Sequence, residues 1–160
     1  MFSLKNTKTK RSCRTLSQTS TNIKDWFFGN HRLKKWVKNN KIHRLHGPAE
    51  ISYVDYFERW YDNGKPHRLN GPAEIWYYET GLIHSERWYD NGKPHRLNGP
   101  AYISYYKTGL IQLEWWFENG KKHRLNGPAE ISYFDTSLIK SAKWYENGIE
   151  QNKKSCSLTM

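Results

Sequence analysis

The sequence predicts an all-β protein, a single-layer twisted antiparallel β-meander built from tandem hairpin repeats. Three observations predict this fold. The heptapeptide HRLNGPA, or HRLHGPA in its first copy, begins at residues 43, 67, 95 and 123, at steps of 24, 28 and 28 residues. A tryptophan stands three residues before an Asn-Gly pair in all four copies. Between these markers the residues alternate with the period of two that is typical of a strand, and a unit copied at a fixed interval is typical of repeat architectures.

The first strand of each unit is predicted from this alternation. Within residues 73–78, Ala73, Ile75 and Tyr77 recur in every copy, whereas the residues between them change from copy to copy. A constant residue at every second position indicates a strand with one packed face.

A turn over residues 79–82 and a second strand from about 83 to 89 are expected to follow. The faces of this second strand are less clean, because Trp88 and Tyr89 are adjacent and both recur as aromatic residues. The Asn-Gly pair at 91–92 closes the hairpin, since both positions of such a turn tolerate φ > 0. The same order of strand, turn, strand and hairpin is predicted for the other units.

The heptapeptide itself is interpreted as a structural joint between units. Its proline lacks a backbone N–H and therefore belongs at a strand entrance, and its Asn-Gly pair adds a bend. The histidine and arginine are then corner residues that bond backbone carbonyls or contact aromatic rings. The repeat signature comprises Trp60, Trp88, Trp116, Trp144, His67, His95 and His123.

A metal-binding histidine ladder is the alternative interpretation of these joints. If each unit adds two strands, equivalent histidines lie roughly 10 Å apart. Zinc needs its ligand nitrogens at about 2 Å, so histidines of neighbouring units do not share an ion. We therefore predict no metal site and no cofactor.

The composition indicates a thin sheet with an aromatic core. Leu, Ile, Val and Phe together make up 30 of 160 residues, which is sparse for a globular chain with a net charge of +11. The 11 Tyr and 8 Trp supply the missing apolar area, because such rings bury about 150–250 Å² each.

The charge is concentrated at the N-terminal end. Residues 1–44 carry 12 Lys and Arg against one acid, Asp25, whereas residues 45–160 carry 14 of each sign. Residues 1–24 are rich in Ser and Thr and are predicted to form a disordered basic arm, and 151–160 a polar tail. The arm is open to three interpretations: a solubilising tail, a polyanion-binding or nuclear-localisation segment, or an organelle transit peptide. The candidate polyanion-binding residues are Lys5, Lys8, Lys10, Arg11, Arg14, Lys34, Lys35 and Lys38.

No enzymatic site is predicted. Two sets of carboxylates recur: Glu58, Glu86 and Glu114, with Ala142 in the fourth copy, and Glu50, Glu74 and Glu130, with Tyr102 in the third copy. Both sets are expected to be cross-strand partners of basic residues. A catalytic site brings different groups to one point, which a repeated carboxylate does not do. The only cysteines lie near the two ends and no apolar run approaches the ~20 residues of a membrane span, which favours an intracellular, reducing location.

The units resemble MORN repeats, in the variant that carries Trp-x-x-Asn-Gly and His-Arg-x-x-Gly-Pro-Ala. The resemblance covers about 36–150, with repeats at about 43–66, 67–94, 95–122 and 123–150, a degenerate start at 25–42, and a possible decayed unit in WFFGNHRL. It implies a trough-like single-layer sheet that acts as a scaffold or dimerises through its ends. The joint heptapeptide is similar to one in proteins of large DNA viruses and phages, which implies a viral accessory or virion-associated protein. The units here are longer than usual, so lipid binding is not carried over.

The sequence therefore predicts a non-enzymatic scaffold for protein–protein interaction or self-association through an aromatic sheet surface. The candidate surface consists of Trp76, Tyr78, Tyr106, Trp115 and Phe134. A strand edge at 144–147 is the expected place for a homodimer contact or a partner strand. The alternative function is a nucleic-acid-associated protein that uses the basic arm. Membrane binding is not expected, because residues 45–160 are neutral.

Overall fold

The computed structural model describes residues 22–28 and 31–152, with side chains from 33 onward, and its described part contains strands and no helix. The twelve-stranded main sheet is formed by β1 (Asn22–Phe28), β2 (His31–Lys38), β3 (Lys41–Ile42), β4 (Glu50–Ser52), β5 (Phe57–Arg59), β8 (Glu74–Tyr77), β9 (Ile83–Arg87), β12 (Tyr102–Tyr105), β13 (Ile111–Trp115), β16 (Glu130–Tyr133), β17 (Ile139–Glu146) and β18 (Ile149–Gln151). Three two-stranded sheets pair β6 (Tyr61–Asp62) with β7 (Lys65–Pro66), β10 (Tyr89–Asp90) with β11 (Lys93–Pro94), and β14 (Phe117–Glu118) with β15 (Lys121–Lys122).

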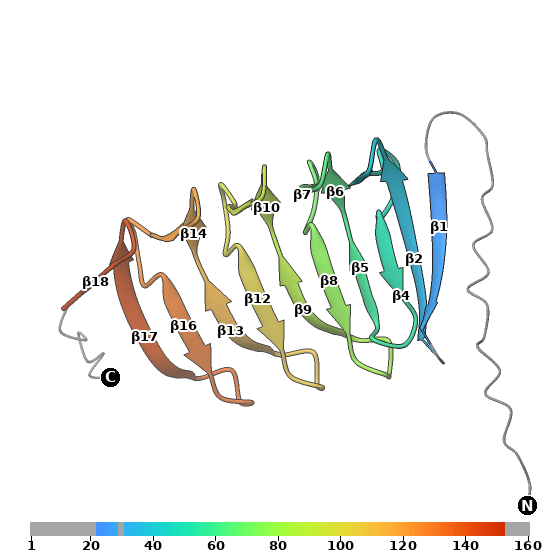
Figure 1. Cartoon of the computed structure of the whole chain (residues 1–160). Coiled ribbons are helices and arrows are strands. Elements are labelled where there is room, and N and C mark those ends of the chain that lie inside the picture. Colours follow the sequence, from blue (N-terminus) through green and yellow to red (C-terminus); the bar gives the residue numbers. More distant parts are fainter. Residues whose placement is uncertain (1–21, 29–30, 153–160) are drawn as a thin grey trace, which may run out of the picture.

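The main sheet is the predicted antiparallel meander. Its strands follow the order β1-β2-β4-β5-β8-β9-β12-β13-β16-β17-β18, with β3 beside β2, and all pairs are antiparallel. The strands form one layer, and the small hairpins stand along one rim, the upper one in Figure 1. Each unit thus adds two strands to the sheet and one hairpin to the rim.

The Asn-Gly turns form as the sequence predicts. Asn91 has φ 48° and Gly92 has φ 85°, and the other units repeat these values closely. Such left-handed angles are accessible to asparagine and free of strain for glycine, which explains the pair. The Gly92 amide donates to the carbonyl of Pro66 at 3.0 Å, and the equivalent bonds join the other hairpins in sequence. The hairpins are therefore held side by side along the rim.

The constant face of the first strand contains the core. Ala49, Ala73, Ala101 and Ala129 are fully or almost fully buried, as are Ile75, Ile103 and Ile131. Each alanine carbonyl accepts a hydrogen bond from the backbone of a tryptophan on the neighbouring strand, for example Trp88 to Ala101 at 2.7 Å. Because the alanine side chain is fully or almost fully buried in every unit, a larger side chain would overpack this position, which explains why it does not vary.

The variable face is more buried than the alternation predicts. Glu50 and Glu74 are only 4% and 8% exposed, and Ser85 and Ser104 are buried too. The strand register explains this burial, because long side chains on adjacent strands lie across these positions: Glu74 is opposite both Arg59 and Arg87.

The expected second strand, 83–89, is divided in two. β9 ends at Arg87 and β10 begins at Tyr89, because Trp88 makes the last bond to the main sheet before the chain turns into the hairpin. Trp88 therefore bonds to the main sheet, whereas Tyr89 belongs to the small sheet of the hairpin, and this explains why the two adjacent aromatic residues do not follow one alternation.

Both ends of the array differ from the sequence expectation. Residues 22–24, assigned to the disordered arm, belong to β1, where Ile23 lies opposite Trp36 and extends the sheet. Gln151, assigned to the polar tail, belongs to β18. The expected free edge at 144–147 is also largely covered, because Trp144, Tyr145 and Glu146 pair with β18. The rest of the arm, 1–21, and of the tail, 153–160, lie outside the described residues.

Candidate interaction surface

The four joints, residues 43–49, 67–73, 95–101 and 123–129, link each hairpin to the next strand of the main sheet. In each of them the histidine Nδ1 accepts a hydrogen bond from the backbone of the next hairpin. His95, for example, accepts from the amide of Asn119 at 3.3 Å, and the other three bonds measure 3.1–3.4 Å. The imidazole thus locks one unit to the next by satisfying an amide at the tip of the Asn-Gly turn.

The joint arginine makes the second connection. The Arg96 guanidinium carbon lies 3.9 Å from the ring centroid of Trp88, and Nη1 donates to the carbonyl of Pro100 at 3.3 Å. The other three arginines repeat both contacts, with stacking distances of 3.7–4.0 Å. A Cβ on Gly99 would lie 2.9 Å from the guanidinium carbon, so glycine is needed for this close approach. The interpretation of the heptapeptide as a structural joint, with arginine on an aromatic ring and a backbone carbonyl, agrees with this geometry.

The joint leucine, by contrast, projects into solvent. Leu45, Leu69, Leu97 and Leu125 are 77%, 87%, 85% and 72% exposed, the highest values among the large apolar side chains of the described residues. An exposed apolar side chain is unremarkable when it is single, but here the same residue is exposed at the same place in every unit. The sequence pattern alone predicts no role for this leucine.

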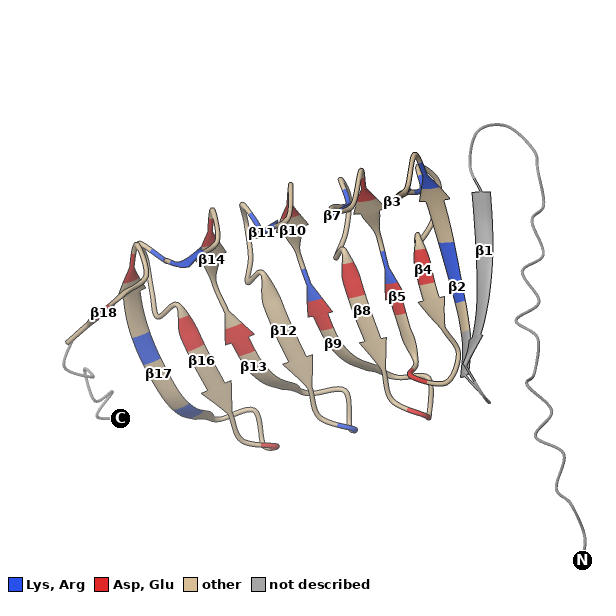
Figure 2. Cartoon of the chain, in the orientation of Figure 1, with Lys and Arg blue, Asp and Glu red and all other residues tan. Residues whose placement is uncertain are grey.

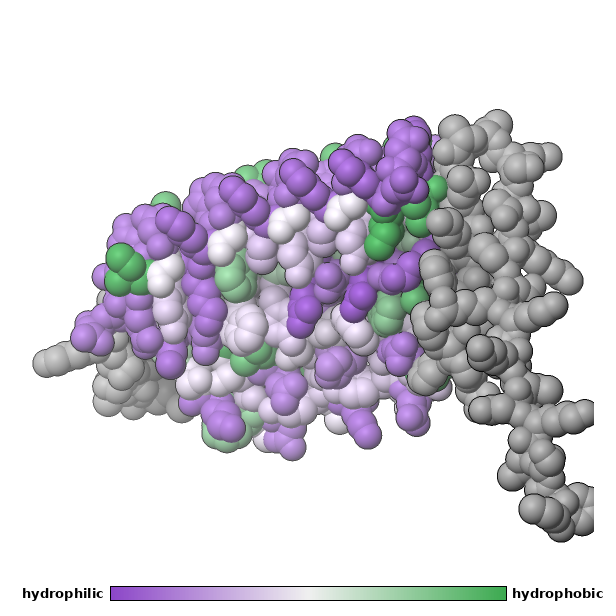
Figure 3. Space-filling view, viewed as in Figure 1, coloured by the Kyte–Doolittle hydropathy of each residue, from purple (hydrophilic) through white to green (hydrophobic). Residues whose placement is uncertain are grey.

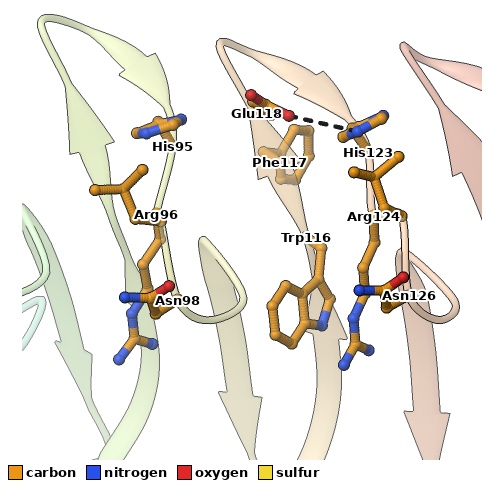
Figure 4. Close-up of a pocket in the computed structure, with 11 residues that line it drawn as sticks. His95, Arg96, Asn98, Trp116, Phe117, Glu118, His123, Arg124 and Asn126 are labelled. Carbon is orange, nitrogen blue, oxygen red and sulfur yellow. Dashed lines mark ion pairs between the residues drawn. The ribbon is translucent and has the colours of Figure 1, made fainter.

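Grooves separate successive leucines. One groove of about 500 Å³ lies between the joints that carry Leu97 and Leu125, and another of about 410 Å³ lies between those that carry Leu45 and Leu69. Figure 4 shows the first of these, with Trp116 between the two joints and Arg124 beside its ring. His123 and Glu118, at 3.4 Å, form the side nearest the hairpin. The rim is therefore a row of apolar projections with aromatic and polar grooves between them.

The hairpin rim is also positively charged. We define it as residues 36–46, 61–70, 89–98 and 117–126, which carry ten Lys and Arg against three acids. Residues 45–160 are neutral in total because acidic residues outside the rim balance the basic residues on it. Among the described residues, none of the four joint arginines forms an ion pair with a carboxylate. Figure 3 shows the rim as a continuous hydrophilic band above a paler sheet surface.

The charges on the sheet, in contrast, are paired across strands. Glu50 lies 2.7 Å from Lys35 and 3.2 Å from Arg59, and Glu74 lies 3.3 Å from Arg87. Figure 2 shows these residues as blue and red bands that alternate over β2, β4, β5, β8 and β9. The expectation that recurring carboxylates have cross-strand partners holds for these two glutamates.

The same expectation is wrong for Glu58, Glu86 and Glu114, which accept hydrogen bonds from tyrosines and form none of the described ion pairs with Lys or Arg. The hydroxyls of Tyr77, Tyr105 and Tyr133 donate to Glu58, Glu86 and Glu114 at 3.2, 2.8 and 2.9 Å, each across to the preceding unit. Burial, followed by the adjacent carboxylate, raises the pKa of Tyr77 and of Tyr133 to about 12, and the pKa of Tyr105 is raised as well. These carboxylates hold neutral phenols in place, which is a structural role.

The aromatic residues predicted to form an interaction surface are mostly engaged with neighbours. Trp76 packs on Phe57 at 4.9 Å between ring centroids, and Trp115 packs on Tyr102 at 4.8 Å. The hydroxyls of Tyr78 and Tyr106 donate to backbone carbonyls of the next unit. The ring centroid of Phe134 lies 5.8 Å from Lys140 Nζ, and 47% of the Phe134 surface is exposed. Since these contacts use much of each ring, the surface they offer to a partner is smaller than the sequence suggests.

The predicted polyanion-binding residues lie partly outside the described chain. Lys5, Lys8, Lys10, Arg11 and Arg14 precede residue 22. Lys34, Lys35 and Lys38 lie on β2; Lys35 is paired with Glu50, and Lys34 lies 5.4 Å from the ring centroid of Tyr53. Of the three described lysines, at least one is thus already neutralised.

No group of three or more His, Cys, Asp or Glu side chains that could hold a metal ion occurs among the described residues. The same part of the chain contains no helix able to cross a membrane.

No family model, curated protein or solved structure matches the chain. The candidate surface therefore rests on its own geometry.

A signal for the joint leucines was present in the sequence. They are large apolar residues beside the charged and polar residues of a loop, and they do not change between copies whose strand residues differ at many positions. The histidine, arginine, asparagine, glycine and proline of the loop all have structural explanations, so the leucine beside them was not predicted to be a separate feature.

Proposed function

We propose that this protein is a non-enzymatic repeat scaffold that binds a protein partner along its hairpin rim. The observation that carries the proposal is the exposure of Leu45, Leu69, Leu97 and Leu125 at every joint. Transfer of one such side chain from water into a contact contributes about 1.5–3 kcal/mol. Four of them in a row therefore offset much of the free-energy cost of association.

The single layer supports a scaffold rather than an enzyme. The grooves along the rim are open and repeated, and their histidines and arginines are engaged in structural contacts. A repeated groove offers the same chemistry several times, which suits an extended partner. Catalysis needs different groups that converge on one reacting atom.

The proposal includes two expectations from the sequence: a MORN-like repeat family, and a viral protein in an intracellular, reducing compartment. The hairpin array is consistent with a MORN-like scaffold, a class that assembles proteins. A viral accessory or virion-associated role in an intracellular, reducing compartment accords with the repeat signature and with the placement of Cys13 and Cys156 near the chain ends. Self-association remains one form that the interaction could take.

Selection of peptides from a random display library tests the proposal. The bait is the full chain, and the counter-selection bait carries L45S, L69S, L97S and L125S together (the joint variant). A matched control carries L82S, L110S and L138S (the turn variant), which changes exposed leucines in the opposite turns. We expect peptides that bind the full chain and the turn variant and not the joint variant. Peptides that bind all three alike would contradict a role for the rim.

A nucleic-acid-associated function is the second candidate, favoured by the 12 Lys and Arg of residues 1–44 and by the positive rim. Phosphate contacts release counterions, so such binding weakens by orders of magnitude between about 50 and 200 mM salt. Fluorescence anisotropy of a labelled DNA duplex with the full chain and with a chain lacking residues 1–24 separates the candidates. Tight, salt-sensitive binding that is lost with the arm would favour nucleic acid, whereas weak binding by both chains would favour the protein scaffold.

A further inference from the structure

We propose that the partner segment on the hairpin rim is an acidic amphipathic α-helix that lies across the units. This inference rests on the proposed function and specifies the chemistry of the partner. Three features of the rim carry it: the spacing of the leucines, the unpaired arginines, and the grooves between the joints.

The spacing matches the heptad of a helix. Each unit adds two strands to the main sheet, so joint leucines recur at roughly 9.6 Å, taking about 4.8 Å per strand. Seven residues of an α-helix rise about 10.5 Å, so apolar residues at every seventh position of a helix have nearly the same spacing as the joint leucines. In an extended strand, side chains on one face recur at about 6.7 Å, which does not match.

The charge of the rim selects an acidic helix. Ten Lys and Arg face three acids, and the four joint arginines have no carboxylate partner among the described residues. Each guanidinium has five N–H donors, and its hydrogen bond to the proline carbonyl uses Nη1 alone. Glutamates that flank the apolar stripe of a helix would reach these guanidinium groups and form charge-assisted hydrogen bonds.

The grooves favour a helix over other occupants. Their volumes of about 410 and 500 Å³ accept a whole apolar side chain between two leucines, and a lipid surface has no side chain to insert there. A polyproline segment has a similar repeat, about 9.3 Å, but it recognises exposed aromatic faces. Here an arginine covers one face of each indole, at 3.7 Å for Trp116.

The first experiment uses a designed, fluorescein-labelled peptide of 28 residues. It has leucine at every seventh position, glutamate on both sides of that stripe, and alanine and glutamine elsewhere. Controls are a scrambled peptide of the same composition and a peptide with lysine in place of glutamate. Of the three peptides, we expect only the glutamate peptide to bind the full chain. It should bind the joint variant about 100-fold more weakly than the full chain, and the turn variant as tightly as the full chain. Since the described fold is all-β, an increase in helical circular dichroism on mixing reports directly on the peptide.

The variants separate binding from folding. The single substitutions L97S and L125S leave the other joints unchanged, and each should weaken binding several-fold even if the joint variant does not fold. Equal binding of the glutamate, scrambled and lysine peptides would overturn the helix proposal, as would binding without a gain of helical signal.

Two further outcomes distinguish this inference from the proposed function. If the display library selects joint-dependent peptides that lack an acidic heptad pattern, the scaffold function stands and the helix proposal fails. If vesicles containing phosphatidylserine bind the full chain with the same dependence on the four leucines, and the peptide does not bind, the rim is a membrane contact and both proposals fail.

Discussion

The sheet and the hairpin rim are built from the same repeated unit, and they use its constant residues differently. On the sheet, the constant alanines are buried and accept backbone hydrogen bonds from the tryptophans, and three of the constant tyrosines donate to glutamates of the preceding unit. On the rim, the joint histidine and arginine are likewise engaged, but the leucine beside them is exposed. The packing of this chain therefore accounts for the constant histidines and arginines, and it does not account for the constant leucines.

The two regions also differ in their charges. The sheet pairs its charges across strands, as between Glu50 and Arg59, whereas the rim gathers ten basic residues with three acids. Paired charges hold neighbouring strands in register, whereas of the ten basic rim residues only Lys122 has a carboxylate partner among the described ion pairs. The rim also holds the units together through the joint histidines and arginines, and it is the region that we propose binds a partner.

The largest expected difference between the two regions is in stability. W88A removes the indole that lies under Arg96 and is expected to lower the free energy of unfolding by about 3 kcal/mol. L97S, in the same unit, should change it by no more than about 0.5 kcal/mol, because its side chain is exposed. Urea unfolding followed by far-ultraviolet circular dichroism measures both. Equal losses for the two variants would remove the distinction between sheet and rim.

The joint arginine should have an intermediate effect. R96M keeps an apolar chain over Trp88 but loses the charge and the bond to Pro100, which is expected to cost about 1–2 kcal/mol. R96K should recover part of this loss. K93M, on the exposed end of the same hairpin, serves as the control and should be near neutral. The urea midpoints of the three variants test the order, and an R96M midpoint equal to that of K93M would contradict it.

The tyrosine–glutamate bonds should contribute less. Y105F removes a donor to Glu86 at 2.8 Å and is expected to cost about 0.5–1.5 kcal/mol. In the last unit Ala142 occupies the glutamate position, and no tyrosine of a following unit reaches it among the described residues. A142E should therefore give no gain in stability. Thermal denaturation of both variants measures the effect, and a stabilising A142E would show that the last unit lacks only its carboxylate.

At high pH, ionisation of the partly buried tyrosines is expected to destabilise the fold. Burial and Glu114 raise the pKa of Tyr133 to about 12, and Tyr77 shifts likewise, so the folded state holds protons that the unfolded chain releases near pH 10. The folded state then binds more protons between about pH 10 and 12, and its stability falls as pH rises through this range. Absorbance near 295 nm follows the titration. E114Q should lower the pKa of Tyr133 and leave that of Tyr77 unchanged; a shift in both would indicate general loosening of the sheet.

Much of the fold could be predicted because its signals are local. The Asn-Gly turns, the proline at each strand entrance and the alternation of Ala73, Ile75 and Tyr77 all act within a few residues. The sequence did not predict that the second strand is divided at Trp88 or that β1 begins at Asn22. Both features depend on which distant strand supplies the hydrogen-bond partners. The candidate aromatic surface was less predictable for the same reason: whether Trp76 is available depends on Phe57, nineteen positions earlier.

The sequence by itself determined the repeat, the order of strands and hairpins, and the role of the heptapeptide as a joint, because spacing and turn chemistry specify these within one unit. Only the tertiary structure decided which side chains meet between units. It placed Arg96 on Trp88, Tyr105 on Glu86 and the basic residues on one rim, and it left the joint leucines in solvent. These outcomes follow from cross-strand register and from the stacking of hairpins, which join residues as far apart as Gly92 and Pro66, 26 positions, and are invisible to a local pattern.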